Sequence, residues 1–149
     1  MLSILVVTFL GAVLGALIGT VWYGPFTPMG RWHMAYLGFD KLTKEEQAKK
    51  IAEAKPQMPK QYALQFLLSA LNSFFVAFVM KNMVANGQPK AGTFGYLAMI
   101  WICFVVPVVG SSLLWGNCPP ELRLKRLASD SGHFLAATMA TGVLAALLM

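Results

Sequence analysis

The sequence predicts an all-α polytopic membrane protein in which four transmembrane helices form a bundle and one short helix lies in the interface. Of the 149 residues, 57% are hydrophobic and only 12% are charged, whereas a soluble domain is about half apolar and about a quarter charged. Four apolar stretches are long enough to cross a bilayer as helices, which takes about 20 residues each. This composition excludes a disordered chain, a disulfide scaffold and most soluble enzymes.

The chain is predicted to be a single membrane domain over residues 1–149, with spans at about residues 2–23, 62–84, 94–115 and 127–149. No Lys or Arg precedes the first stretch, so the positive n-region of a signal peptide is missing. We therefore expect the first stretch to be retained as a span.

The connection over residues 24–61 contains two predicted helices. Thr27 followed by Pro28 is typical of an N-cap and first helical position, and Gly38 ends this short helix. Its larger side chains recur every three or four residues, which predicts an amphipathic interfacial helix, anchored by Met29, Trp32, His33 and Tyr36. Thr43 and Glu46 then form a capping box that opens a charged helix running to about Ala54.

The later connections are shorter. Residues 86–89, with the sequence Asn-Gly-Gln-Pro, predict a turn, and Thr93 is placed to cap the third span. Pro119 and Pro120 indicate a helix that starts before the fourth span enters the lipid. That helix is expected to project into the cytoplasm.

Basic residues are distributed unequally between the connections. The first connection carries seven, the third carries three and the second only two, Lys81 and Lys90. The positive-inside rule therefore places the first and third connections in the cytoplasm or its equivalent. Both termini are predicted to lie on the non-cytoplasmic side.

The end of the first span carries the most specific motif, Trp22-Tyr23-Gly24-Pro25-Phe26, which is followed by Gly30, Trp32 and Gly38. Together these residues resemble the bacterial integral-membrane family catalogued as domain of unknown function 1761, over nearly the whole chain. The family shows a Trp-Tyr-small-Pro motif at this place. The resemblance implies a four-helix membrane protein and no known activity.

Small residues recur every four positions in the first span, at Gly11, Gly15 and Gly19. Such a stripe lets helix backbones approach closely in lipid. It would serve packing within one chain or a seam between two chains.

In the third span, Pro107 removes a helical hydrogen bond and frees the carbonyl of Cys103. Pro107 thus predicts either a structural kink or a discontinuity at a transport site.

The most suggestive polar residues lie at the start of the fourth span. Arg126, Asp130 and His133 share one helix face, and ionisable residues inside a membrane are functional candidates. They would form a proton-handling or ligand-binding cluster, or merely an Arg126-Asp130 pair and an interfacial histidine. Asn72 lies deeper, where its amide would bridge helices or contact a substrate.

Catalytic and metal-binding motifs are absent from the sequence, and Cys103 and Cys118 have no metal-type spacing, so we expect no enzyme, no metal and no cofactor. The basic residues lie between apolar runs and not on one folded face, which argues against nucleic acid. The predicted role is a non-catalytic, oligomeric or accessory membrane subunit whose partners are the bilayer and other chains. The alternative is a small-solute or proton-coupled transporter with a site near Asn72, Pro107, Asp130 and His133.

Overall fold

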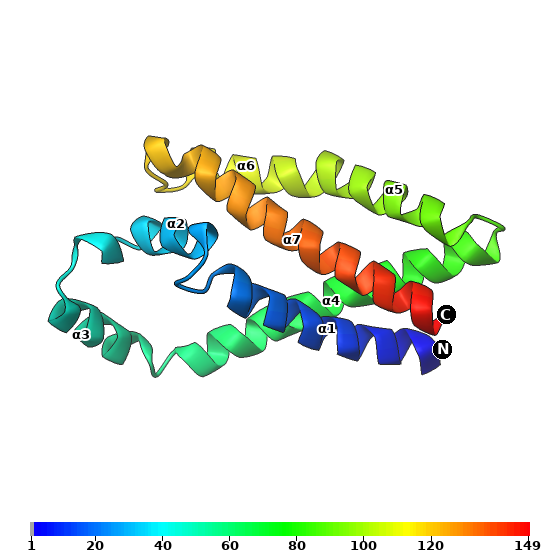
Figure 1. The fold of residues 1–149 in the computed structure, drawn as a ribbon, viewed down its shortest axis with the longest axis horizontal. Coiled ribbons are helices and arrows are strands. Elements are labelled where there is room, and N and C mark those ends of the chain that lie inside the picture. Colours follow the sequence, from blue (N-terminus) through cyan, green and yellow to red (C-terminus); the bar gives the residue numbers. More distant parts are fainter. Residues whose placement is uncertain (1) are drawn as a thin grey trace.

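A computed structural model describes residues 2–149, and every regular element in this range is helical (Figure 1). Four helical runs are long and apolar enough to cross a membrane: α1, α4, the continuous run from α5 to α6, and α7. The predicted fold class is thereby confirmed. The elements are α1 (Leu2–Trp22), α2 (Pro28–Tyr36), a 3-10 turn η1 (Phe39–Lys41), α3 (Lys44–Ala54), α4 (Met58–Ala85), α5 (Lys90–Ile100), a π-turn η2 (Trp101–Val105), α6 (Val106–Trp115) and α7 (Pro120–Leu148).

Helices α1, α4 and α7 pack against one another and form what we call the three-helix core. The run from α5 to α6 lies along α7 on the outside of this core (Figure 1). The two termini lie together at one end, here the terminal end, and α2 and α3 lie at the other, here the α3 end. Near the terminal end, six buried apolar residues form a hydrophobic cluster: Val7, Val76, Ala77, Met80, Leu97 and Ala145.

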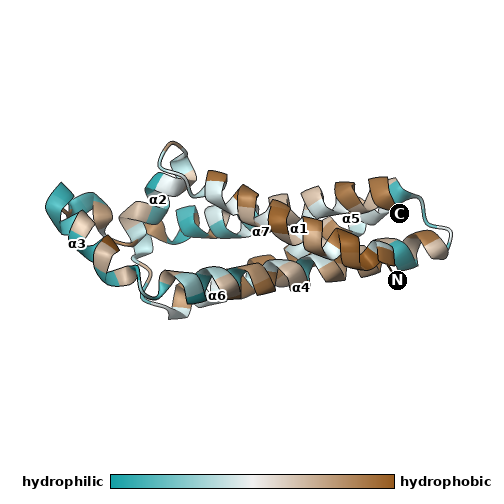
Figure 2. Ribbon diagram, turned by 90° about the horizontal axis from the view of Figure 1, so that it is seen from below, coloured by the Kyte–Doolittle hydropathy of each residue, from teal (hydrophilic) through white to brown (hydrophobic). Residues whose placement is uncertain are grey.

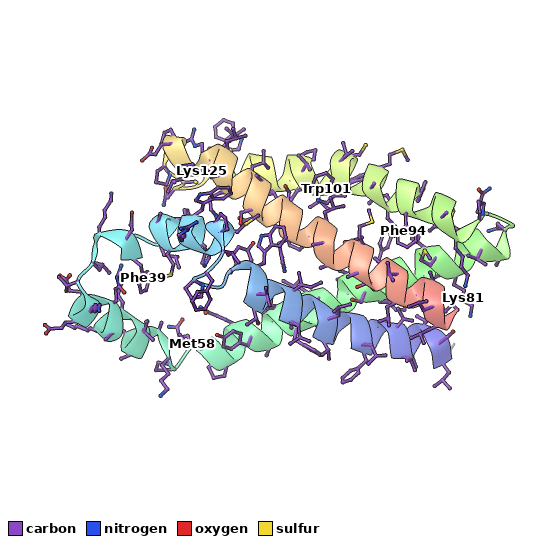
Figure 3. All side chains as sticks on the ribbon, viewed as in Figure 1. Phe39, Met58, Lys81, Phe94, Trp101 and Lys125 are labelled. Carbon is purple, nitrogen blue, oxygen red and sulfur yellow. The ribbon has the colours of Figure 1, made fainter. Side chains whose placement is uncertain are left out.

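Hydrophobic and hydrophilic residues lie at different positions along the long axis of the molecule (Figure 2). The long helices are mainly hydrophobic along their middle, and α3 with its neighbouring loops is hydrophilic. Lys81 and Lys125 mark the two opposite ends (Figure 3). A slab of apolar side chains with polar ends is the pattern that a bilayer requires.

The helix that starts after Thr43 in the first connection begins where the sequence predicts. The helix that follows the second connection does not. Thr43 and Glu46 form the predicted capping box, with the Thr43 backbone N–H donating to Glu46 Oε2 at 2.8 Å. The predicted cap at Thr93 is wrong, because α5 begins at Lys90 after Pro89 and Thr93 is fully buried inside the helix. Pro89 is the extended residue that precedes α5, so Thr93 lies within the helix and cannot be its N-cap.

The third membrane-length helix accommodates Pro107 by a wider turn ahead of it. Residues Trp101–Val105 form a π-turn, in which the Val106 N–H donates to the carbonyl of Trp101. Proline cannot donate a backbone hydrogen bond, and π-turns are found inside α-helices, frequently at functional sites. The turn directs the Trp101 side chain toward α7 (Figure 3).

Candidate functional site

The polar residues singled out by the sequence meet at the α3 end of the three-helix core. Tyr23 follows the last turn of α1, His33 lies on α2, and Arg126 and Asp130 lie one turn apart on α7. We call these four residues the Arg126 network. It joins segments that are about ninety to one hundred and ten residues apart in the chain.

Arg126 is the centre of this network. Its Nη2 lies 2.7 Å from Asp130 Oδ2, and its Nη1 lies 2.6 Å from His33 Nδ1. A guanidinium has only donors, so Nδ1 of His33 must be the accepting nitrogen. The Tyr23 hydroxyl donates to the other carboxylate oxygen of Asp130 at 2.8 Å. The guanidinium also lies over the ring of Tyr36, 4.5 Å from its centroid, a distance at which cation–π attraction operates.

The loop between α1 and α2 holds Tyr23 and His33 in place. Thr27 caps α2, accepting from the Gly30 N–H at 2.9 Å, and its hydroxyl donates back to the Trp22 carbonyl at 2.6 Å. A side chain at Gly30 would overlap the carbonyl of Gly24. The two glycines therefore let the start of α2 fold directly onto the end of α1.

Two tryptophans tether α7 on either side of the network. Trp22 of α1 donates through its indole N–H to the carbonyl of Ser129 at 3.0 Å, and Trp101 of the π-turn donates to the carbonyl of Ser131 at 2.6 Å. Gly132 lies against the Trp22 ring, where a Cβ atom would be only 3.2 Å from Trp22 Cζ2. These contacts fix the rotation of α7 about its axis and so orient Asp130 and His133.

His133 lies one turn deeper than Asp130 and is 7% exposed. Its ring is surrounded by the rings of Trp22, Tyr23 and Phe134, with centroids 5.4 to 6.4 Å away. Its Nε2 faces α1 at Gly19, where a Cβ atom would lie 3.1 Å away. Within residues 2–149 this nitrogen forms no hydrogen bond of ordinary geometry, although the ring lies close to the backbone of Gly15.

Burial changes the acid–base behaviour of the two network residues that lie outside the long helices. The pKa of Tyr23 is raised, chiefly because burial disfavours the phenolate and also because Asp130 is close. The pKa of His33 is lowered from 6.5, first by burial and then by the positive charge of Arg126, while Asp130 acts in the opposite direction. Both effects follow from disfavouring a buried or repelled charge. At neutral pH both side chains are therefore neutral.

The glycine stripe of α1 faces the inside of the chain. A Cβ at Gly11 would lie 2.7 Å from Ser73 Oγ, one at Gly15 would lie 3.6 Å from Ser69, and Gly19 faces His133. Asn72 lies in the same region, where its Oδ1 is 3.4 Å from the hydroxyl of Thr138 on α7. Asn72 and His133 line one cavity.

Other predicted residues lie apart from the network. Pro107 is exposed on the outer helix and does not line that cavity. Pro25 is exposed in the loop after α1, and Trp32 is half-buried on α2. No group of three or more His, Cys, Asp or Glu side chains that could hold a metal is found over residues 2–149.

Sequence reasoning missed the contacts of Tyr23 and His33. The spacing of Arg126 and Asp130 on one helix predicts their pairing, but no spacing relates His33 to Arg126, which is 93 positions away. The sequence marked Trp22 and Tyr23 only as part of a family motif, and in the structure their polar atoms donate to α7. The signal that could have indicated this was the motif itself, which places two aromatic donors just before a turn.

Comparisons with known proteins give one match. The model of the family described as "Protein of unknown function (DUF1761)" matches residues 6–147. No curated protein and no solved structure matches the chain. The family match covers all four long helices and every residue of the Arg126 network.

Proposed function

The chain belongs to the DUF1761 family of proteins of unknown function, and we propose that it is a non-catalytic membrane carrier that moves protons or a small polar solute through its three-helix core. The single observation that carries this proposal is His133. It is a buried ionisable residue with an unpaired ring nitrogen, in a helix long and apolar enough to cross a membrane. Ionisable residues within transmembrane segments are rare, and they mark substrate paths and proton relays.

The residues on either side of His133 support a path for protons or solute through the core, because His133 is not an isolated polar residue there. Toward the α3 end, its ring lies beside Tyr23, which belongs to the Arg126 network. Toward the terminal end, it lines a cavity with Ser69, Asn72 and Ser73 of α4. Gly11, which lines the same cavity, lies halfway along α1, about 16 Å from Trp22 at 1.5 Å per residue. A dry and wholly apolar interior would instead have favoured a purely structural role.

Proton uptake into liposomes tests this function. The purified protein is reconstituted with a pH-sensitive dye inside, and an inward proton gradient is applied. The native protein should acidify the interior faster than empty liposomes, and His133→Gln should lose this activity because an amide does not titrate near neutral pH. Phe104→Leu is the matched control, since Phe104 is 67% exposed on the outer helix. A native protein no faster than empty liposomes, for protons and for a panel of small polar solutes alike, would refute the proposal.

A second function, an oligomeric or accessory subunit of a membrane assembly, is favoured by a different observation. The outer face of η2 and α6 exposes large apolar side chains, including Ile102, Phe104 and Val108, which lipid or another subunit could cover. Cys103 is exposed on this run, so mild oxidation in native membranes tests for a neighbouring copy. A disulfide-linked dimer that Cys103→Ala abolishes would support the assembly role, and monomers only would argue against contact through this face.

A further inference from the structure

A small cavity lies between α1, α4 and α7, next to His133. Its volume is about 40 Å³, and by this measure one water molecule needs about 10–15 Å³. The space therefore holds about three water molecules and is too small for an organic solute. Gly11 and Gly15 form its wall on α1, where a side chain would occupy it.

The lining is mostly apolar, and its polar side chains carry no charge. Gln65, Ser69, Asn72 and Ser73 line the cavity from α4, and His133 lines it from α7. An inorganic ion placed there would lose its hydration without gaining an opposite charge, which is strongly unfavourable. Hydroxyl, amide and imidazole groups each hydrogen bond to water in either direction or in both. The chemistry of the lining therefore selects water.

His133 supplies an independent reason for a bound ligand. More than nine-tenths of the residue is buried, and Nε2 has no partner among the described residues. An unsatisfied buried polar atom costs about 1–3 kcal/mol, and buried water molecules commonly pair with such atoms. His133 lines the cavity, and Nε2 faces Gly19, one turn beyond the cavity wall at Gly15, so a water molecule at this edge of the cavity would satisfy the nitrogen.

We infer that this cavity binds a short chain of water molecules anchored on His133, and that the species it passes is a proton. This inference rests on the proposed carrier function and names its substrate. The step balances without an ion entering the cavity: each water molecule of the chain accepts a proton on one side and gives one up on the other, the last transfer turns the neutral imidazole into imidazolium, and the reverse transfers release the proton. The path runs from the Arg126 network, past the Tyr23 ring, to His133 and then along the water chain toward the middle of the core.

Water-edited solid-state NMR of the full chain in liposomes tests the water site directly. With ¹⁵N-labelled histidine, magnetisation transferred from water to the His133 ring reports contact, and the spectrum of His33→Gln assigns the two rings. We expect transfer in the native protein and its loss in Gly15→Ala. The new Cβ would lie 3.6 Å from Ser69 and 4.0 Å from Ala137, which is ordinary contact, and it would take up space in the cavity next to His133. Gly95→Ala is the control, because nothing lies within 4 Å of a Cβ there.

The possible results of these experiments distinguish a failure of the water site from a failure of the proposed carrier function. A folded native protein whose His133 ring receives no water magnetisation would overturn the water site, whatever its flux. Water contact at His133 without proton flux would leave the water site standing and remove the carrier function. Unchanged flux in Gly15→Ala after loss of the water signal would show that protons take another path, against the inference. Ser69→Ala serves if Gly15→Ala folds poorly, and it should weaken the water signal by removing one partner.

Discussion

Arg126 is the charged residue that connects the separate parts of the functional site. It pairs with Asp130, donates to His33 and lies over Tyr36, so one residue connects α7 to α2. A buried ion pair is not in itself strong evidence of stabilisation, because desolvation offsets its attraction. The contribution of Arg126 is to position other groups. It holds the interfacial helix onto the end of the core and orients Asp130 toward Tyr23.

The bond between Arg126 and His33 predicts that stability depends on pH. Arg126, Asp130 and Tyr23 are the charged and titratable groups that face His33. Because the folded pKa of His33 lies below 6.5, the unfolded chain binds more protons between the two pKa values, and stability rises with pH there. We expect the unfolding midpoint in detergent to fall as pH drops below 6.5.

His33→Gln is the matched variant for this prediction. The Gln carbonyl can accept from Arg126 but does not titrate, so the fall in midpoint at low pH should become shallower. An equally steep fall in His33→Gln would assign the pH dependence to other groups and contradict the prediction.

Tyr23 makes a hydrogen bond whose contribution can be isolated. Tyr23→Phe keeps the ring between the two histidines and removes only the hydroxyl that donates to Asp130 at 2.8 Å. A hydrogen bond to a charged group contributes about 1.5–3 kcal/mol, so the thermal midpoint should fall measurably. Tyr62→Phe is the control, because Tyr62 is exposed on α4 and should show no shift. Equal midpoints for the two variants would show that the Tyr23 hydroxyl contributes nothing to folding.

At the scale of elements, the sequence predicted most of what depends on local chemistry. Four apolar runs, the Thr27 cap and the Thr43 capping box all reflect interactions within a few residues, and the structure contains them. The π-turn and the position of Thr93 were missed, because both depend on which helix lies alongside. Trp101 reaches Ser131 only because α7 packs there, and no local pattern reports that neighbour.

The glycines of α1 also show that a sequence pattern can predict a close contact without identifying the helix that is contacted. Their spacing predicted a close helix contact but left open whether the contact lies within one chain or between two. In the structure, Gly11 faces Ser73 of α4 and Thr141 of α7. Packing inside one chain therefore accounts for the absence of a side chain at this position.

Gly11→Ala should destabilise the three-helix core. The added Cβ would lie 2.7 Å from Ser73 Oγ and 2.8 Å from Thr141 Cγ2, so α1 must shift outward, and overpacking of this kind costs about 1–3 kcal/mol. Gly95→Ala in α5 meets open space and should be neutral or stabilising, since Ala favours helix over Gly by about 1 kcal/mol. The thermal midpoints of both variants in detergent check this, and a Gly11→Ala protein as stable as Gly95→Ala would contradict the packing.

The whole molecule is asymmetric along its long axis. Ten of its basic residues belong to α2, α3 and the starts of α4 and α7 with their loops, and Lys81 and Lys90 lie at the opposite end. The Arg126 network lies at the basic end, so the proposed path opens on the side where that end lies. The positive-inside rule predicts that this side is the cytoplasm, in which case proton entry or release at His33 would respond to cytoplasmic pH.

Cysteine labelling in intact cells tests this orientation. In a background with Cys103→Ala and Cys118→Ser, a thiol is placed at Gln88 between α4 and α5, or at Ala48 on α3, both of which are exposed. Ala48 is preferred to Gln47, because the Gln47 amide bonds the carbonyls of Phe39 and Leu42 and holds α3 against η1. A membrane-impermeant maleimide applied outside should label Gln88→Cys and leave Ala48→Cys unlabelled until the membrane is permeabilised. The opposite pattern would place the Arg126 network outside the cell, and the proton path would then open to the exterior through His33.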